Sequence, residues 1–195
     1  MNFNPPPHHG GDGYLTSLML IATPSMGDPR FVKSVIYLCA HTPSVAMGLV
    51  VNKPCHSVTA HDLFERHQID CPKRYGDLPI MMGGPVETSQ GFVLHSADYN
   101  EQGSLRVDDN VALTATVTIL QSIIKDEGPD RYLLALGYAG WSGGQLDREV
   151  QNGDWLTVPP DLDIIFDHDI DTKWDRALAS IGVGVSQLVS SSGHA

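Results

Sequence analysis

The stretch that decides the fold is Ser34–Pro54, SVIYLCAHTPSVAMGLVVNKP. It contains two apolar runs, Val35–Cys39 and Val45–Val51, on either side of the short polar break His41–Ser44. β-Branched and aromatic side chains dominate both runs, and such side chains suit a pleated strand. Because the break is short, we expect the second run to fold back on the first as a β-hairpin. Neither run alternates between apolar and polar residues, so both faces of the hairpin are expected to be covered.

Length and composition are those of one globular domain. A chain of 195 residues with 42% hydrophobic residues can enclose a sizeable core. No apolar run approaches the roughly 18 residues that a membrane span needs, so no membrane association is expected. Residues 1–14 lack the basic and apolar segments of a secretory signal and are predicted to be a disordered leader. A single domain over residues 15–183 and a flexible tail over residues 184–195, in a cytoplasmic protein, complete the predicted organisation.

The three cysteines, Cys39, Cys55 and Cys71, form no closely spaced pair. This usage is typical of reduced thiols in a reducing compartment. A metal site built from Cys39, Cys55, His41 and His56 is the alternative, but structural zinc sites need ligand pairs at short, regular spacing. We therefore predict no metal and no cofactor.

The acidic segment Asp167–Asp171 imitates the first half of a calcium-binding loop. A calcium loop of this kind needs glycine at its sixth position and a bidentate glutamate at its twelfth. Thr172 and Leu178 occupy these two positions. The segment is therefore predicted to be a solvated acidic turn.

The charge balance argues against nucleic acid as a direct partner. Twelve basic residues against 23 acidic ones leave a net charge of −11. Binding to a duplex requires clustered Lys and Arg that displace counterions from phosphates. The nearest approach to such a cluster is the pair Lys73-Arg74. Direct binding to DNA is therefore disfavoured.

Apolar runs and turn signals predict an alternation of strands and helices along the chain. Besides the hairpin, strands are expected at Leu18–Ala22, Ile80–Met82, Gly91–His95, Ser104–Val107, Val111–Thr114, Leu133–Leu136, Trp155–Val158 and Leu162–Phe166. Helices are expected to begin at the capping box Thr59–Asp62, at Thr116, near Gln145 and at Thr172. Strands at both ends of the chain with helices between them predict a single α/β domain.

Two glycine-rich segments are candidates for function. Gly83-Gly84 could approach an anion closely or form a tight turn between strands, and the absence of phosphate-loop spacing favours the turn. Gly137–Leu146 is expected to link a buried strand to a helix, which is where α/β proteins bind ligands. Trp141 and Trp155 could form walls of such a site, or they could staple the loop to the core. The sequence leaves these two roles open.

Several blocks of the sequence together resemble one known family. The blocks are LIATPSMGDPRFVKSVIYLCAH, AMGLVVNKP, MMGGPV followed by GFVLH, LALGYAGWSGGQLDREV, WLTVPPDLDIIF and KWDRALASIGV. Over roughly Leu18–Val183 they resemble the bacterial AlgH/YqgE family. The resemblance implies a single-domain α/β fold with a mixed, strongly curved β-sheet flanked by helices. It also implies the label of transcriptional regulator, which rests on a genetic effect. No catalytic residues are established for that family, so none is carried over.

Polar and aromatic residues of these blocks define a candidate ligand-binding cleft. They are Asn52, Lys53, His95, Tyr138, Trp141, Gln145 and Glu149. Each ends or follows an apolar strand, and strand ends meet at one edge of a sheet. Lys53, isolated in an acidic protein, favours a small anionic or carbonyl-bearing ligand, and a protein partner is the other possibility. The alternative is that these groups only cap and brace the sheet edge.

An enzyme is the rival class of function. Glu149 or His95 would act as general base and Lys53 as electrophile, because these residue types are the usual proton-transfer and charge-stabilising groups. The sequence carries no GxSxG, HExxH, Walker or GxGxxG motif in its required context. Binding of a small ligand or a partner is therefore the favoured hypothesis.

Overall fold

The computed structural model describes residues 14–182. The strands are β1 (Met19–Ala22), β2 (Val35–His41), β3 (Val45–Val50), β4 (Ile80–Met82), β5 (Val86–Ser96), β6 (Leu105–Arg106), β7 (Val111–Thr114), β8 (Tyr132–Ser142) and β9 (Trp155–Val158). The helices are α1 (Ala60–Arg66), α2 (Lys73–Gly76), α3 (Val117–Ile124), α4 (Gln145–Gln151), α5 (Leu162–Phe166), the 3₁₀ turn η1 (Ile170–Thr172) and α6 (Lys173–Ala179). Except for Tyr14, the predicted leader and tail lie outside the described residues.

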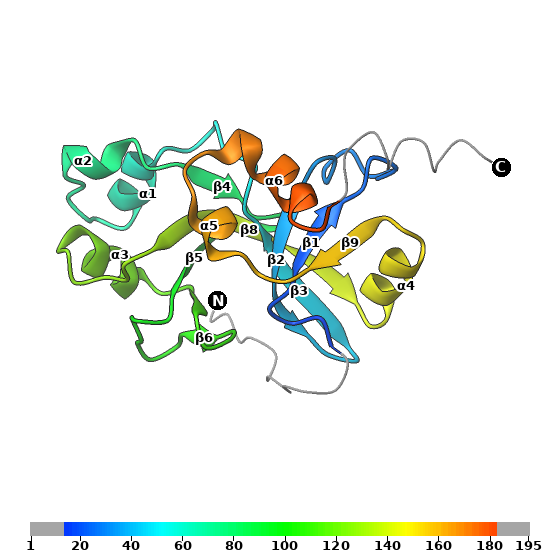
Figure 1. Cartoon of the computed structure of the whole chain (residues 1–195). Coiled ribbons are helices and arrows are strands. Elements are labelled where there is room, and N and C mark those ends of the chain that lie inside the picture. The colour runs from blue at the N-terminus through cyan, green and yellow to red at the C-terminus, as the bar shows by residue number, and fades with distance from the viewer. Residues whose placement is uncertain (1–13, 183–195) are drawn as a thin grey trace.

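All nine strands belong to one sheet, in the order β6-β7-β5-β8-β3-β2-β1-β9 with β4 added beside β8. The β4–β8 pair is parallel and the other pairs are antiparallel, so the predicted mixed sheet is confirmed. β8 extends through the middle of the molecule, with β5 and β4 along its first part and β3 along its last part (Figure 1). The predicted hairpin is formed by β2 and β3. Its core positions are buried on both faces.

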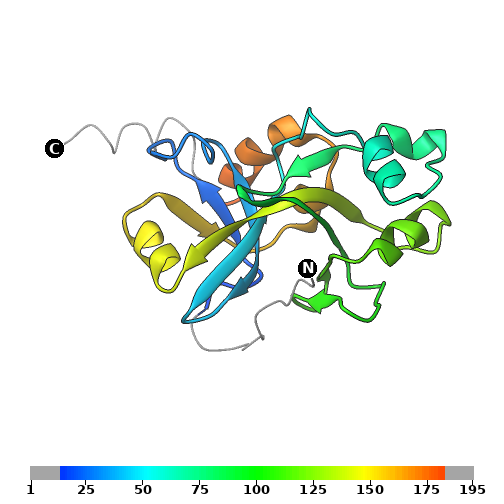
Figure 2. The same ribbon diagram turned by 180° about the vertical axis from the view of Figure 1, so that it is seen from behind.

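Helices cover both faces of this curved sheet. Helices α5 and α6 pack on one face, where their apolar residues join Tyr37, Leu49 and Leu133 in the largest core cluster. The opposite face is covered by α1 and α3 over one half of the sheet and by Leu146 of α4 over the other half. Figure 2 shows this division from behind, with α1, α2 and α3 (teal and green) at one end and α4 (yellow) at the other. The predicted α/β architecture with flanking helices is confirmed.

The central strand β8 is longer than predicted, because the glycine-rich segment after Leu136 continues as strand to Ser142. Gly137 adopts a φ of 69°, a conformation that glycine reaches without strain, and it lies at a bulge, where the register of β5 and β8 shifts between the pairs Gly91–Leu136 and Val86–Tyr138. Before the bulge Leu133 faces α5 and α6; after it Tyr138 faces them, and Trp141 faces α4. The bulge thus decides which side chains of the glycine-rich segment share a face.

The pair Gly83-Gly84 allows two backbones to cross closely. A Cβ atom built on Gly84 would lie 2.1 Å from the carbonyl carbon of Tyr138, and one on Gly83 would lie 2.3 Å from the carbonyl oxygen of Gly137. The N–H of Gly83 donates to the carbonyl of Leu136, and its own carbonyl accepts from Val50. These glycines therefore serve packing between β4 and β8.

One predicted strand, Leu162–Phe166, is instead the helix α5. Asp161 caps it, since its side chain accepts hydrogen bonds from the N–H groups of Asp163 and Ile164. A five-residue apolar run does not distinguish a strand from a buried helical turn, and the capping signal at Asp161 decides between them. Among residues 14–182 no helix has the length and apolar character needed to cross a membrane.

Candidate functional site

An open pocket of about 350 Å³ lies beside α4, and we call it the tryptophan pocket. On one side it is lined by Trp141 of β8, Trp155 of β9, and Gln145 and Glu149 of α4. The loop of residues 26–31 forms the opposite side. Its volume lies within the range of small-molecule sites, which is about 300–1,000 Å³.

The carboxylate of Glu149 lines the tryptophan pocket and is held by three donors. Its Oε2 atom accepts hydrogen bonds from the indole Nε1–H of Trp141 at 2.8 Å and from that of Trp155 at 2.9 Å. Its Oε1 atom accepts from the side-chain amide of Gln145 at 2.9 Å. The two indoles are 4% and 2% exposed and lie edge to face. Three neutral donors therefore hold one carboxylate in a fixed orientation at the pocket.

The turn between β8 and α4 positions these groups. The side-chain Oε1 atom of Gln145 accepts hydrogen bonds from the backbone N–H and the hydroxyl of Ser142. These bonds fix the side-chain amide so that its nitrogen faces Glu149. Gly143 packs against the β2–β3 turn, where a Cβ atom would lie 2.6 Å from the carbonyl oxygen of Pro43. Gln145 and Glu149 are four residues apart on one helical face, as the sequence predicted.

The opposite side of the pocket carries an ion pair. The guanidinium of Arg30 donates to both carboxylate oxygens of Asp28, with Nη2 at 2.6 Å from Oδ2. These hydrogen bonds lower the pKa of Asp28. Phe31 packs edge to face on Trp155 with ring centroids 5.6 Å apart. The aromatic contact holds this loop against β9, and the ion pair fixes the conformation of the loop itself.

Comparison with known proteins assigns the family. A family model described as AlgH-like matches residues 19–186. A UPF0301 protein of Methylobacterium sp. strain 4-46 is 49% identical over 191 residues, covering 94% of this chain and 91% of the relative. One from Rhodospirillum rubrum is 45% identical over 184 residues, covering 94% and 96%. The chain belongs to the AlgH-like family.

Solved structures of similar chains agree with this assignment. The solution structure of the AlgH protein from Pseudomonas aeruginosa superimposes with a TM-score of 0.78 at 37% identity, covering 96% of this AlgH-like chain and all of the other. A crystal structure of a Corynebacterium diphtheriae protein superimposes with a TM-score of 0.68 at 19% identity, covering 92% and 90%. The second likeness shows the shared fold alone.

Of the residues predicted from sequence, the AlgH-like fold brings three into the pocket: Trp141, Gln145 and Glu149. Asn52 and Lys53 lie behind the loop that forms its far side. The Asn52 side chain accepts from the N–H of Val35 and donates to the carbonyl of Lys33. The Nζ atom of Lys53 donates to the carbonyl of Arg30 at 2.8 Å, and partial burial lowers its pKa. Both side chains brace the loop that carries Asp28 and Arg30.

His95 and Tyr138 do not join the pocket, so the predicted convergence of all seven residues is wrong. His95 pairs in register with Tyr132, nine residues along β8 from Trp141, which corresponds to roughly 30 Å of strand. It is fully buried, with its ring nitrogens bonded to the carbonyl of Ser96 and the hydroxyl of Thr114, and burial lowers its pKa. Tyr138 packs on Phe92, on the face of β8 opposite Trp141. The reason is that β5 and β8 run antiparallel. The end of β5, which carries His95, therefore pairs with the beginning of β8, whereas Trp141 lies near the end of β8.

The charged and aromatic pocket residues that sequence reasoning did not assign to a site are Asp28, Arg30, Phe31 and Asp154. The first three belong to the segment between β1 and β2, for which the cap residue Asp28 and Pro29 favour a short helical turn, and the structure has a non-helical turn there. The available signal was an aromatic residue next to two opposite charges in a loop, followed by a buried strand. Such a loop has no fixed partner until the fold places it beside β9 and α4.

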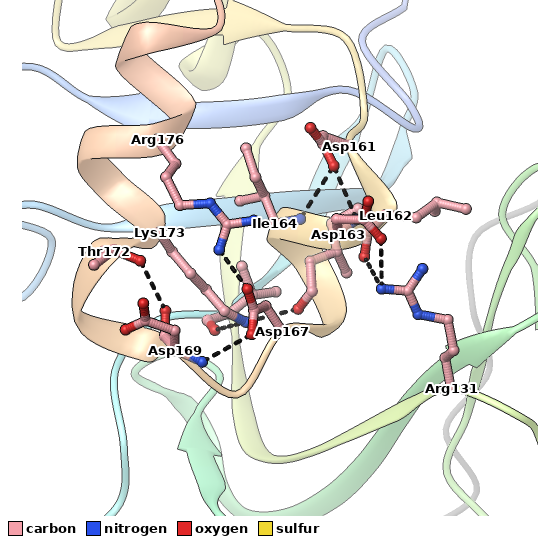
Figure 3. Close-up of polar contacts among 12 residues, drawn as sticks. Arg131, Asp161, Leu162, Asp163, Ile164, Asp167, Asp169, Thr172, Lys173 and Arg176 are labelled. Atoms are coloured by element: carbon pink, nitrogen blue, oxygen red, sulfur yellow. Dashed lines mark hydrogen bonds and ion pairs between the residues drawn. The ribbon is translucent and has the colours of Figure 1, made fainter.

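A second polar cluster, shown in Figure 3, serves the packing of α5 and α6. Asp167 accepts from the N–H of Asp169 and from Arg176, and these contacts lower its pKa to about 2. Lys173 is fully buried and donates to the carbonyls of Val51 and Ile165, and burial lowers its pKa to about 8. Arg131 binds Asp163 and the carbonyl of Leu162. These side chains bond to one another and to nearby backbone groups, as expected for a structural cluster.

Metal-ligating groups are sparse in residues 14–182. His61, Asp62 and Glu65 of α1 are the group there whose ligand atoms lie close enough to hold a metal, and all three are exposed. Asp62 is already the partner of Thr59 in the capping box that the sequence predicted. Cys39 is a buried core residue, and all three cysteines are free.

Proposed function

We propose that this AlgH-like protein is a regulatory binding protein whose small ligand occupies the tryptophan pocket. The observation that carries the proposal is the Glu149 carboxylate, which lines an open pocket and is oriented by two buried indoles and one amide. A few convergent polar groups among aromatic walls are the usual composition of a ligand site. Any effect on transcription would then pass from the ligand-bound protein to a protein partner.

The Glu149 carboxylate has a fixed orientation and faces an open pocket, so it can do more than brace α4 against the sheet. A carboxylate that only tied α4 to the sheet would be expected to lie in a closed contact, whereas Glu149 is half-buried and lines an open cavity. Preorganised polar groups favour binding, because their ordering cost is met during folding and not on association. The bracing role and the binding role are therefore compatible at this position.

Direct DNA binding has little support from the arrangement of the cations. Five arginines lie in ion pairs with aspartates: Arg30, Arg74, Arg106, Arg131 and Arg176. A cation already paired with a carboxylate has less to gain from a phosphate. We propose a protein partner in the cytoplasm, where the three free cysteines would remain reduced.

The three residues of the rival enzyme hypothesis, Glu149, His95 and Lys53, do not share a site in this fold. His95 is buried in another part of the sheet, and Lys53 is bonded to a backbone carbonyl outside the pocket lining. Glu149 alone reaches the pocket. The combination of these three groups in one reaction therefore has no geometric basis.

A pocket-filling substitution tests the proposal. Gly27 lines the pocket, and a Cβ atom built on it meets no atom within 4 Å. Gly27→Phe should therefore obstruct the pocket while leaving the melting temperature within a few degrees of wild type. In a strain lacking the gene, wild-type protein should restore the transcript profile and the Gly27→Phe variant should not.

Gly76→Phe is the matched control. Gly76 also has no atom within 4 Å of a built Cβ, and it lies at the end of α2, far along the sheet from α4. This variant should restore the transcript profile like wild type. Full restoration by Gly27→Phe would show that the pocket is not the functional site.

A further inference from the structure

The charges that line the tryptophan pocket indicate the chemical class of its ligand. Three carboxylates line it, those of Asp28, Glu149 and Asp154, against the single guanidinium of Arg30. Asp28 and Arg30 neutralise each other in their ion pair. The carboxylates of Glu149 and Asp154 therefore leave an excess of negative charge on the side formed by α4 and β9.

Neither remaining carboxylate is neutralised by its surroundings. The donors that hold Glu149 are two indoles and an amide, which carry no charge, and its Oε1 atom accepts from Gln145 alone. A carboxylate oxygen accepts about two hydrogen bonds, so Oε1 can take another donor. Within residues 14–182 the Asp154 carboxylate has no hydrogen-bond or ion-pair partner.

The backbone places Asp154 firmly beside Glu149. Its N–H donates to the carbonyl of Glu149 at 2.9 Å, and its carbonyl accepts from the N–H of Thr23 at 3.0 Å. The two acidic residues are therefore held together by the connection between α4 and β9 and by Thr23, the residue that follows β1. Aromatic side chains of Phe31, Trp141 and Trp155 supply the apolar part of the same pocket.

Among the described residues, 14–182, the lining of this pocket offers an anionic ligand no cation without a carboxylate partner. The Nζ atom of Lys53 is turned to the carbonyl of Arg30, and Lys53 is not part of the lining. The guanidinium of Arg30 already donates through Nε and Nη2 to Asp28, so its positive charge is shared with that carboxylate. Carboxylates beside aromatic rings are instead the usual surroundings of an organic cation.

We propose that the ligand of the tryptophan pocket carries an amidinium, guanidinium or ammonium group that binds between Glu149 and Asp154. This inference rests on the proposed function and replaces the sequence-based expectation of an anionic or carbonyl-bearing ligand. The cation donates to the vacant lone pair of Glu149 and to Asp154, and its apolar body lies against Phe31.

Benzamidine, benzamide and benzoate test the charge, because they have nearly the same shape and carry charges of about +1, 0 and −1 at neutral pH. The readout is the set of indole N–H signals in a ¹H–¹⁵N spectrum of the full chain. Trp141 and Trp155 donate to Glu149, whereas Trp174 donates to the carbonyl of Ala22 on the other face of the sheet and serves as internal reference. Benzamidine should shift the first two signals and leave the third.

The expected order of affinity is benzamidine over benzamide by about tenfold or more, with no saturable shift from benzoate. Asp154→Asn should weaken benzamidine binding about tenfold. Asp109→Asn removes the same charge at an exposed turn far from α4 and should change nothing. Added salt should weaken the binding of benzamidine.

Two results would overturn the assignment. Benzoate or benzamide binding at the same indoles as tightly as benzamidine would contradict a cationic ligand, while a ligand-binding pocket would stand. No shift by benzamidine at about 10 mM would also reject the cation site, since a fragment of this size should bind a matched pocket at millimolar concentration. The proposed function itself is judged separately, by restoration of the transcript profile with Gly27→Phe.

Discussion

Trp141 of β8 and Trp155 of β9 lie edge to face with ring centroids 6.0 Å apart, although three strands separate β8 from β9 in the sheet. Through its pairing with β3, Trp141 is in register with the end of β2. Through its pairing with β1, Trp155 is in register with the beginning of β2. In a flat sheet these positions would be on the order of 30 Å apart, from four strand spacings and seven residues of strand. The contact therefore measures how strongly the sheet is curved.

Sheet twist explains how the two rings meet. A right-handed twist turns a broad sheet into a saddle, in which opposite corners approach each other over one face. Trp141 and Trp155 occupy opposite corners, and α4 fills the space between them with Leu146. Glu149, on the same helix, is thereby brought to both indole nitrogens. The tryptophan pocket is thus a consequence of the overall curvature.

Replacing Glu149 by glutamine should destabilise the fold. One carboxylate oxygen would become an NH₂ group facing either the indoles or the amide of Gln145, so at least one donor would lose its acceptor. We expect a loss of about 2 kcal/mol in the free energy of unfolding, measured in urea. The control Glu65→Gln, on the exposed surface of α1, should stay within about 0.5 kcal/mol of wild type. An unchanged unfolding midpoint for Glu149→Gln would contradict the network.

Gly84→Ala should be among the most destabilising small substitutions in this chain. The added Cβ would lie 2.1 Å from the carbonyl carbon of Tyr138, and a backbone cannot yield as a flexible side chain can. A loss of about 3 kcal/mol or more is expected from thermal or urea unfolding. Gly91→Ala is the matched comparison, since a Cβ built on Gly91 of β5 meets nothing within 4 Å. Equal losses for both variants would show that the close crossing of β4 and β8 is not required.

Lys173 should make stability rise with pH in the alkaline range. Its pKa is about 8 in the fold against 10.5 for a free side chain, so between these values the unfolded chain holds a proton that the folded chain has released. Stability then increases with pH by at most about 1.4 kcal/mol per pH unit. Melting temperatures of wild type and Lys173→Met, compared from pH 7.5 to 9.5, isolate this effect. The wild type should gain relative to the variant, and parallel curves would refute the low pKa.

Purified protein should not bind duplex DNA tightly. Its net charge of −11 repels the phosphates of DNA, and five of its arginines are already paired with aspartates. At a physiological ionic strength of about 0.15 M we expect no complex with a dissociation constant below about 1 µM in a gel-shift titration. A nanomolar complex that weakens steeply with salt would show that the protein acts on DNA directly.

Local sequence signals predicted much of the fold. The hairpin of β2 and β3, the capping box of α1 and the placement of Gln145 and Glu149 on one helical face depend on residues close together in the chain. Such features follow from side-chain shape and hydrogen bonding over a few residues. The run Leu162–Phe166 shows the limit of this reasoning, because a short apolar segment fits either a strand or a helix, and α5 is a helix.

The sequence by itself determined that this chain forms an acidic α/β domain of the AlgH-like type with a buried central hairpin. Only the tertiary structure decided which polar residues share a site. The bulge at Gly137 moves Trp141 from the face of Leu133 to the face of α4, and the antiparallel pairing of β5 with β8 places His95 at the far end of β8. Sheet curvature then joins Trp155 and the loop of residues 26–31 to Glu149. These contacts depend on the accumulated twist of the strands, a property of the whole sheet that no short stretch of sequence contains.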